Sequence, residues 1–366
     1  MFTAADHAFM TRALRLAEQG LYTTMPNPRV GCVIAKNGNI VGEGVHLFAG
    51  EPHAEVHALS MAGEDARGAD VYVTLEPCSH HGRTPPCADA LVKAGVKRVI
   101  AAMQDPNPLV AGNGLAKLAA HGIESASGLM ETQARALNPG FISRMSRNRP
   151  FIRTKIAASL DGKTALANAT SQWITGEAAR NDVQHWRARS CAILTGISTV
   201  LADDPLMTVR LPELVDRKQG RQPLRIVLDS GLKIPAQARI LQDSQTIVAY
   251  ASDPDGRADS LKQANVELLQ LPGDDGHVCV QRLLEALAQR EINEVLVEAG
   301  AVLNGALQTS SLIDEYLIYY APVLLGDAGK GMFSLALTDM SQRMQLEILD
   351  MRQVGSDLRV QARPRS

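Results

Sequence analysis

The sequence has little of what marks an exported or membrane-bound protein. Its 366 residues include only five cysteines, an odd number that is sparse for this length. It has no run of about 18 apolar residues that could cross a bilayer. Residues 1–20 have the pattern of an amphipathic helix, without the apolar segment and cleavage site of a signal peptide. We therefore expect a cytoplasmic protein without a membrane partner, in which the cysteines are reduced.

Basic charge and aromatic side chains are also scarce. The net charge is -2, and the chain holds six Phe, six Tyr and two Trp. Basic stripes with interleaved aromatic residues are therefore missing, which argues against a nucleic-acid partner. A small phosphorylated ligand is compatible with this charge, because a few local arginines suffice to bind it. No G-x-G-x-x-G follows an expected strand, so a Rossmann dinucleotide-binding unit is not indicated.

The length predicts two domains, since single domains cluster near about 100–200 residues. With 45% hydrophobic and 21% charged residues, the composition provides a core for each. The basic, polar stretch at residues 145–150 is the expected linker. We therefore expect an N-terminal domain at 1–147 and a C-terminal domain at 148–366.

The N-terminal half alternates expected helices and strands. Helices are predicted at 5–19, 53–63, 85–95, 112–122 and 129–147, and strands at 30–35, 40–46, 70–77 and 97–106. The first two strands form a hairpin about Asn37-Gly38, a dipeptide typical of two-residue turns. This order predicts a three-layer α/β domain.

The C-terminal half continues the alternation with apolar strands. Strands are predicted at 151–159, 191–196, 224–229, 246–250, 266–271, 294–300 and 316–326, and helices near 176–189, 198–203, 279–290 and 301–310. Apolar strands that alternate with helices favour a mostly parallel sheet covered on both faces. The expected fold class is therefore α/β, with two three-layer domains in sequence.

Three residues of the N-terminal half have the pattern of a metal site. His53 opens a helix, Cys78 follows a strand after Pro77, and Cys87 lies at the start of the next helix. One imidazole and two thiolates are ligands of a catalytic zinc that keeps its fourth position for water. Such an ion lowers the pKa of the water to about 7. We therefore expect one Zn²⁺ per chain at this site.

Glu55 is the candidate catalytic residue. It lies two positions after His53, which on a regular helix would turn the two side chains about 200° apart. At a helix start the geometry is less strict, so the carboxylate can lean over the water on the metal. There it would take a proton from water and deliver it to the ring and the leaving amine, help worth about 10²–10⁴-fold.

Two alternatives to a catalytic zinc stay open. A structural zinc would need a fourth protein ligand, for which His57, His80 and His81 are candidates. The eight residues between the cysteines exceed the spacing of about two to four that is usual in structural sites. In the other alternative, a core histidine and two buried cysteines lie close together without a metal.

These residues resemble those of the zinc-dependent cytidine and deoxycytidylate deaminases, whose pattern is H-x-E…P-C-x-x-C. The longer motifs are similar to one branch, the deaminases of riboflavin biosynthesis. They are T-x-x-N-P-x-V-G at residues 24–31 and T-L-E-P-C-S-H-x-G-R-T-P-P-C at residues 74–87. The wider spacing of the cysteines separates the chain from the nucleic-acid-editing members.

The C-terminal half resembles the reductases of the same biosynthesis, whose fold is similar to that of dihydrofolate reductase. The motifs are K-x-A-x-S-L-D-G-K at residues 155–163, S-x-W-I-T-G at 171–176, L-x-D-D-P-x-x-T-V-R at 201–210 and E-A-G at 298–300. The resemblance covers nearly the whole chain and implies a bifunctional enzyme. Its zinc domain would deaminate 2,5-diamino-6-(5-phosphoribosylamino)pyrimidin-4(3H)-one. Its second domain would use NADPH to reduce the ribosyl chain of 5-amino-6-(5-phosphoribosylamino)uracil to ribityl.

The resemblance also implies binding residues in the reductase half. NADPH would contact Ala157, Trp173, Thr199, Asp203, Ser230, Gly300, Ala301, Val302, Leu303, Asn304, Gly305 and Ala306. The reductase substrate would contact Lys155, Ser171, Arg187, Met207, Arg210 and Glu298. The glycines at 196 and 300 join a strand end to a helix start, as in phosphate sites, although a tight turn has the same pattern. Trp173 could equally be a core residue and Arg187 a solvated one, and the proton donor stays open between Lys155 and Glu298.

Three further residues are substrate candidates in the deaminase half. Asn27, on the loop before the first strand, would read a ring edge or a ribose hydroxyl, unless it serves only the turn. His81 and Arg83 lie between the two cysteines, where a cation suits a ribose phosphate, unless that loop is only solvated.

Two other functions fit the zinc pattern by itself. One is a nucleic-acid base deaminase with an accessory binding domain, and the other is a non-enzymatic scaffold held by a four-ligand zinc. We also expect a homo-oligomer, taken as a dimer, because α/β enzymes of this size often pair.

Overall fold

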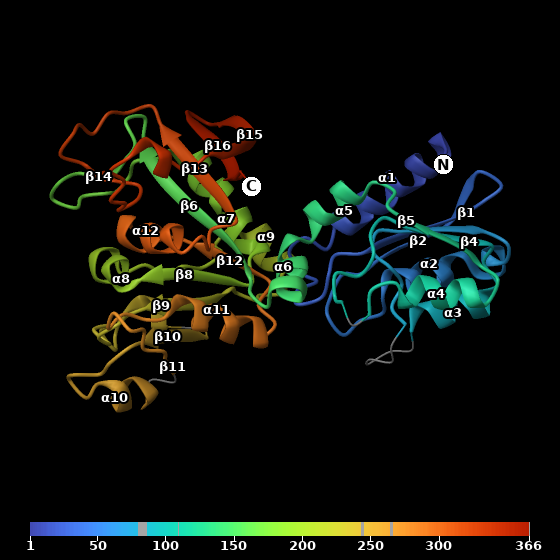
Figure 1. Ribbon diagram of the computed structural model, residues 1–366, viewed down its shortest axis with the longest axis horizontal. Coiled ribbons are helices and arrows are strands. Elements are labelled where there is room, and N and C mark those ends of the chain that lie inside the picture. Colours follow the sequence, from blue (N-terminus) through green and yellow to red (C-terminus); the bar gives the residue numbers. More distant parts are fainter. Residues whose placement is uncertain (80–85, 109, 243–244, 264–265, 366) are drawn as a thin grey trace. The chain divides into compact units, whose positions relative to one another are not determined.

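The computed structural model describes residues 1–79, 86–108, 110–242, 245–263 and 266–365. The chain divides into two compact units, Met1–Arg149 and Pro150–Ser366, which we call the N-terminal and C-terminal units (Figure 1). The division lies two residues beyond the boundary expected at residue 147. Among the described helices, none has the length and apolar character needed to cross a membrane.

The N-terminal unit is a five-stranded sheet between two layers of helices. The strand order is β2-β1-β3-β4-β5, and β1 runs antiparallel to β2 and β3 whereas β3, β4 and β5 are parallel. The strands are β1 (Gly31–Lys36), β2 (Asn39–Val45), β3 (Asp70–Val73), β4 (Arg98–Ala101) and β5 (Glu124–Ser127). The helices are α1 (Ala4–Glu18), α2 (Ala54–Ala62), η1 (Gly63–Ala66), α3 (Cys87–Ala94), α4 (Asn113–Ala120), α5 (Glu131–Leu137) and α6 (Pro139–Arg147). Helices α1 and α5 lie on one face, and α2, α3 and α4 on the other (Figure 1).

Two glycines allow the helices to approach the sheet closely. A Cβ at Gly31 would lie 2.0 Å from the carbonyl oxygen of Ala13 in α1. A Cβ at Gly44 would lie 2.0 Å from the carbonyl oxygen of Ala54 at the start of α2. Any larger residue would force the backbones apart. The second contact holds the first turn of α2, and with it His53, directly against β2.

One expectation for the N-terminal unit is wrong, and one strand of it was missed. The single helix expected at 129–147 is broken between α5 and α6 at Asn138, because Pro139 lacks an N–H and is tolerated only in the first turn of a helix. The buried Asn138 amide instead exchanges hydrogen bonds with the backbone of Arg29. Strand β5 was not expected, since its sequence ESAS has no apolar alternation and it is only half-buried.

The C-terminal unit contains a nine-stranded sheet in the order β11-β10-β9-β8-β12-β6-β13-β16-β15. The strands are β6 (Phe151–Ser159), β8 (Ala192–Gly196), β9 (Leu224–Leu228), β10 (Thr246–Tyr250), β11 (Glu267–Gln270), β12 (Glu294–Val297), β13 (Glu315–Ala321), β15 (Leu346–Val354) and β16 (Asp357–Pro364). All neighbours from β11 to β13 are parallel, so the predicted parallel sheet is confirmed. A separate two-stranded sheet pairs β7 (Lys163–Ala165) with β14 (Lys330–Gly331).

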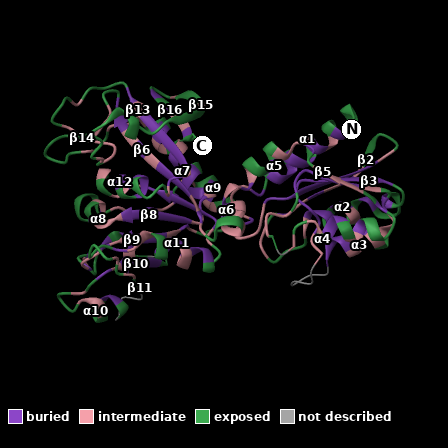
Figure 2. Cartoon of the chain, viewed as in Figure 1, coloured by how far each residue is buried: buried purple, intermediate pink, exposed green. Residues whose placement is uncertain are grey.

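Helices lie between most of these strands. They are α7 (Glu177–Arg189), α8 (Ile197–Asp203), α9 (Pro212–Arg217), η2 (Arg239–Leu241), α10 (Ala258–Gln263), α11 (Val280–Gln289), α12 (Ala301–Thr309) and η3 (Met340–Gln342). Buried residues are concentrated in the central strands of each unit (Figure 2). The α/β class expected from the alternation is therefore confirmed for both units.

The sequence prediction missed the antiparallel end of the larger sheet. Strand β13 ends at Ala321, before Pro322, and not at residue 326 as expected, because proline cannot donate to a strand ladder. The hairpin of β15 and β16 was not expected at all. Strand β15 is exposed along most of its length, so its apolar residues do not form the pattern of a buried face.

Candidate functional site

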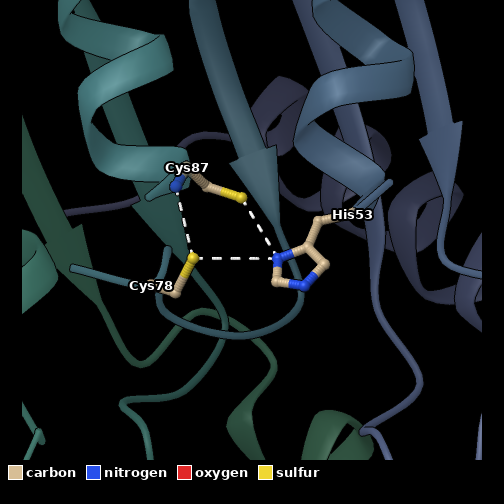
Figure 3. A group of neighbouring side chains, drawn as sticks. All are labelled: His53, Cys78 and Cys87. Carbon is tan, nitrogen blue, oxygen red and sulfur yellow. Dashed lines mark hydrogen bonds between the residues drawn. The ribbon is translucent and has the colours of Figure 1, made fainter. Parts of the chain in front are cut away.

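The three predicted metal ligands converge in the N-terminal unit. His53 is the N-cap of α2, Cys78 lies in the loop after β3, and Cys87 is the first residue of α3. Their donor atoms all lie within 4.8 Å of one another. The Nδ1 atom of His53 is 3.3 Å from the Cys87 sulfur and 3.7 Å from the Cys78 sulfur (Figure 3). Three segments distant in sequence therefore place one imidazole and two thiols around a single point.

The chemistry of these donors fits zinc. The backbone N–H of Cys87 donates to the Cys78 sulfur over 3.2 Å. Of the two facing thiols, Cys78 has its pKa lowered by the Cys87 side chain and also by His53 against the opposing effect of burial, whereas the Cys78 side chain and burial raise the pKa of Cys87. A thiolate is the form that binds metal. Among the described residues only three donors join the group, which is the number used by catalytic zinc sites.

The structure describes only one of the three candidates for a fourth protein ligand. His57 lies one turn after His53 on α2, but its side chain is exposed and it does not join the group. His80 and His81 lie outside the described residues, as does Arg83. The structure therefore gives no support to His57 as a ligand.

Glu55 lies beside the three donors, at the start of α2. It is 3% exposed, and burial raises its pKa to about 7. The Cys87 side chain is a hydrogen-bond neighbour of this carboxyl group. The turn of about 200° expected on a regular helix does not apply, because His53 has the extended backbone angles φ −74° and ψ 164° of an N-cap. Both side chains can therefore face the same point.

Asn27 is held next to the metal ligands by a histidine that the sequence prediction missed. Its Nδ2 atom donates to Nε2 of His46 over 3.0 Å, and Nδ1 of His46 donates to the carbonyl oxygen of Pro52 over 3.1 Å. These bonds need a neutral imidazole, and burial lowers the pKa of His46. The His46 ring also meets the His53 ring edge-on, with centroids 5.3 Å apart. The only signal in the sequence was a polar residue at the end of an expected strand.

The C-terminal unit holds a cavity of about 590 Å³, within the range of about 300–1,000 Å³ that is usual for ligand sites. The cavity lies beside the middle of β6, the end of β12, helix α8 and the start of α12. It brings together twelve of the predicted residues: Lys155, Ala157, Ser171, Trp173, Arg187, Thr199, Asp203, Met207, Arg210, Glu298, Gly300 and Ala301.

Arg187 is buried in the cavity wall and paired with Glu298. Its Nε and Nη2 atoms donate to the two carboxylate oxygens over 2.6 and 2.9 Å, and Nη1 donates to the carbonyl oxygen of Thr208. Although burial opposes it, Arg187 keeps the pKa of Glu298 below its usual value, while burial lowers the pKa of Lys155. The alternative that Arg187 is a solvated helix residue is therefore wrong.

Trp173 lies at the surface of the cavity. Its side chain is 71% exposed, and the guanidinium of Arg180 lies 4.8 Å from its ring centroid. The alternative that Trp173 is a core residue is therefore wrong. The buried tryptophan of this unit is Trp186, which is 8% exposed.

Six of the predicted cofactor residues are absent from the described cavity lining. They are Ser230, Val302, Leu303, Asn304, Gly305 and Ala306. Ser230 accepts a hydrogen bond from the backbone of Val278. The Asn304 amide bonds to Thr154 and to the Ala299 carbonyl, and a Cβ at Gly305 would lie 2.3 Å from the Ser334 oxygen. Ser230, Asn304 and Gly305 therefore have structural contacts of their own.

The charges around the cavity favour an anionic ligand. Six cationic side chains line it, from Lys155, Arg180, Arg187, Arg210, Arg239 and Lys330, against the two carboxylates of Asp203 and Glu298. Sequence reasoning missed Arg180, Arg239 and Lys330, because a single basic residue outside a motif gives no local signal. Together these residues attract phosphate groups.

Comparison with known proteins gives matches in both units. The family described as cytidine and deoxycytidylate deaminase zinc-binding region matches residues 3–103, and that described as RibD C-terminal domain matches residues 150–360. The riboflavin biosynthesis protein RibD of Escherichia coli is 50% identical over 361 residues, which cover 96% of this chain and 98% of that protein.

Solved structures match over the full length as well. Acinetobacter baumannii RibD is 46% identical with a TM-score of 0.91, and 99% of each chain is covered. The diaminohydroxyphosphoribosylaminopyrimidine deaminase/5-amino-6-(5-phosphoribosylamino)uracil reductase of Thermotoga maritima is 36% identical with a TM-score of 0.86, again over 99% of both chains. With its zinc-ligand group, its second unit and these full-length relatives, the chain belongs to the family of bifunctional deaminase/reductases of riboflavin biosynthesis.

Proposed function

We propose that the N-terminal unit is a hydrolytic deaminase whose zinc is held by His53, Cys78 and Cys87. The observation that carries this proposal is the convergence of the three donor atoms within 4.8 Å, with a buried carboxylic acid beside them. When bound there, zinc supplies a Lewis acid that makes a water molecule a nucleophile at neutral pH.

Glu55 is the residue that moves protons in this proposal. Its carboxyl group is buried beside the three donors, and a general acid and base must lie within reach of the proton that it moves. It takes one proton from the attacking water at a carboxylate oxygen and passes it to the ring nitrogen. It then carries the second proton, from the added hydroxyl, to the amine, which leaves as ammonia. Asn27, fixed by His46, orients the ring or the ribose of the substrate.

We propose that the cavity of the C-terminal unit binds NADPH together with the reductase substrate. The N-cap of α12, Gly300, has no side chain to occupy the first turn of the helix, and a Cβ added there would meet nothing within 4 Å. Helix N-termini of this kind bind phosphate groups, and the surplus of cationic residues supports the same use. NADPH supplies the hydride when bound, while Lys155, Arg210 and the Arg187–Glu298 pair bind and orient the substrate.

We propose that the substrates are those named for the Thermotoga maritima relative. The deaminase unit would act on the diaminohydroxyphosphoribosylaminopyrimidine, and the reductase unit on 5-amino-6-(5-phosphoribosylamino)uracil. Full-length similarity to that protein supports this assignment. We further propose that the enzyme works in the cytoplasm as a homodimer, which light scattering on purified protein would test.

A single assay tests the proposed function. The phosphoribosyl diaminopyrimidinone is supplied to the purified full-length protein with and without NADPH, and both ammonia release and NADPH oxidation are followed. Ammonia without NADPH, followed by NADPH oxidation at matching yield when it is added, is the expected result. Ammonia release without NADPH oxidation would leave the deaminase standing and overturn the assignment of the C-terminal unit. Absence of ammonia release from zinc-loaded protein would overturn the deaminase and favour a scaffold role for the metal.

A further inference from the structure

A buried carboxylate holds the loop that carries Cys78. Glu76 lies two residues before this ligand and is 5% exposed. One of its oxygens accepts the backbone N–H groups of Gly114 and Leu115 over 2.8 and 3.2 Å. The other accepts those of Gly112 and Asp105 over 2.9 and 3.0 Å. Four backbone donors therefore converge on one side chain.

The bonds to Glu76 replace the missing cap of α4. The first N–H groups of a helix have no partner within the helix, and a side chain at the N-cap usually accepts one of them. The N-cap of α4 is Gly112, with φ +81° and no side chain. Glu76 supplies the acceptor from the loop after β3, and it also places negative charge at the positive end of the helix dipole.

The same loop lies directly on the first turn of α4. A Cβ at Gly114 would lie 2.0 Å from the carbonyl oxygen of Pro77, a distance that only glycine permits. The backbone from Glu76 to Cys78 is therefore fixed to α4 both by hydrogen bonds and by close contact.

The three zinc ligands differ in how their backbones are supported. His53 and Cys87 each lie at the start of a helix, whereas Cys78 lies in a loop without regular structure. The position of the Cys78 sulfur consequently depends on whatever anchors that loop. On the α3 side, the Cys78 carbonyl accepts the N–H of Ala88 over 3.1 Å and its sulfur that of Cys87. On the α4 side, the carboxylate of Glu76 anchors the segment that precedes Cys78.

We propose that Glu76 is a positioning residue of the metal centre, which sets the place of the Cys78 sulfur through the N-terminus of α4. The inference rests on the proposed zinc site. It concerns a residue whose carboxylate bonds to the N-terminus of α4 and to Asp105, and which acts through the ligand loop. Residues that orient metal ligands in this way typically change metal affinity about 10–100-fold when replaced.

The test is Glu76→Gln in the full-length protein. Glutamine keeps the size of the side chain, but one of its terminal atoms is a donor, so two of the four N–H groups lose their acceptor. Zinc affinity, measured by competition with a chelator, should fall about 10–100-fold. In the cobalt-loaded protein, the sulfur-to-cobalt charge-transfer bands should weaken. Reductase activity in the same preparation should not change.

The matched control is Glu124→Gln, which alters an exposed carboxylate on β5, the strand next to α4. It should leave zinc affinity and the cobalt spectrum unchanged. A purely structural role of Glu76 would lower the unfolding temperature of the variant without changing zinc affinity or the cobalt bands, and this result would overturn the inference.

Two further outcomes are also decisive. If Glu76→Gln does not fold, Glu76→Asp keeps the charge and shortens its reach, and unchanged zinc affinity in that variant overturns the inference. Failure of the unmodified protein to bind zinc would overturn the proposed metal centre and this inference with it. Equal zinc affinity in the unmodified protein and the folded variant would overturn the inference alone.

Discussion

Arg187 and Glu298 form a bidentate ion pair in the wall of the C-terminal cavity, with N–O distances of 2.6 and 2.9 Å. The two side chains are 11% and 10% exposed. Glu298 is also the carboxylate that attracts the ammonium of Lys155. One carboxylate therefore balances two cations, and the arrangement of the reductase site depends on it.

Glu298→Gln should destabilise the C-terminal unit and impair reduction. The substitution leaves the charges of Arg187 and Lys155 without their counterion, and breaking a buried pair in this way costs about 3 kcal/mol or more. Both tryptophans of the chain lie in this unit, so urea unfolding followed by tryptophan fluorescence reports on it selectively. Ammonia release should be unaffected.

The control for this prediction is Asp259→Asn, which breaks an exposed pair with Lys262 in the same unit. Its effect on the free energy of unfolding should stay within about 0.5 kcal/mol. Equal effects of the two substitutions would mean that the buried pair contributes nothing beyond a surface contact.

Glu55→Gln should abolish most deamination and leave the metal in place. Glutamine cannot exchange a proton as a carboxylate does, so the rate should fall by at least about 10²–10⁴-fold, while zinc content measured by atomic absorption stays at the level of the unmodified protein. Glu64→Gln, at an exposed carboxylate of the same unit, should retain full activity. A Glu55→Gln enzyme with near-normal ammonia release would show that the proton moves by another route.

Cys87→Ser should remove both zinc and deamination but spare reduction. A serine hydroxyl is a poor zinc ligand compared with a thiolate, and the two active units have separate cores. The variant should still oxidise NADPH when it is given substrate that has already been deaminated. Cys279→Ser, at the N-cap of α11, is the matched control. Loss of both activities in Cys87→Ser would mean that the units do not fold independently.

The zinc ligands could be predicted from the sequence because each occupies a locally recognisable position, at a helix start or a strand end. The helix start also allowed Glu55 to lean toward these ligands, and the structure supplies the physical reason, since His53 is an N-cap with extended backbone angles and not a residue within the helix. The parallel sheet was predictable from its apolar strands, whereas the exposed strand β15 has no buried face to reveal it.

The polar contacts within the sites were harder to predict from the sequence than the motifs. Arg187 and Glu298 are 111 positions apart, so nothing in either segment indicates that the guanidinium already has a partner. Glu76 lies 36 and 38 positions before Gly112 and Gly114, and their contact follows only from the packing of α4 against the loop after β3. Short motifs identify the residue types of a site, but the partners that fix these residues come from tertiary structure.

Asp6 makes the N-terminal unit sensitive to acid. This carboxylate, 1% exposed, accepts hydrogen bonds from the backbone of Thr3, the Tyr72 hydroxyl and Arg98. Burial raises its pKa, but these bonds outweigh that effect and hold the pKa well below its usual value. The stabilisation is present above the unfolded-state pKa of about 3.9 and is lost as the pH falls from there through the lower native value.

Asp6→Asn should accordingly lower the free energy of unfolding at neutral pH by about 1.5–3 kcal/mol and flatten its decline in acid. Urea unfolding followed by circular dichroism at several pH values measures this free energy. Tryptophan fluorescence reports the unfolding of the C-terminal unit alone, so the two transitions can be told apart. Asp65→Asn, at an exposed side chain, should follow the unmodified curve. A variant that keeps the original acid dependence would assign that dependence to other carboxylates.

Gly300 and Gly305 belong to one predicted cofactor segment, but Gly300 faces open space whereas Gly305 packs closely against Ser334. Gly300 lines the cavity, and a Cβ at this position would have no atom within 4 Å, so Gly300→Val should fold normally and block the ligand. We expect the KM for NADPH to rise about tenfold, which corresponds to a loss of about 1.4 kcal/mol in binding free energy. Gly305→Ala should instead destabilise the C-terminal unit by about 1–3 kcal/mol, because its Cβ would lie 2.3 Å from the Ser334 oxygen. If Gly300→Val leaves the KM unchanged while the fold is intact, NADPH does not bind at the start of α12.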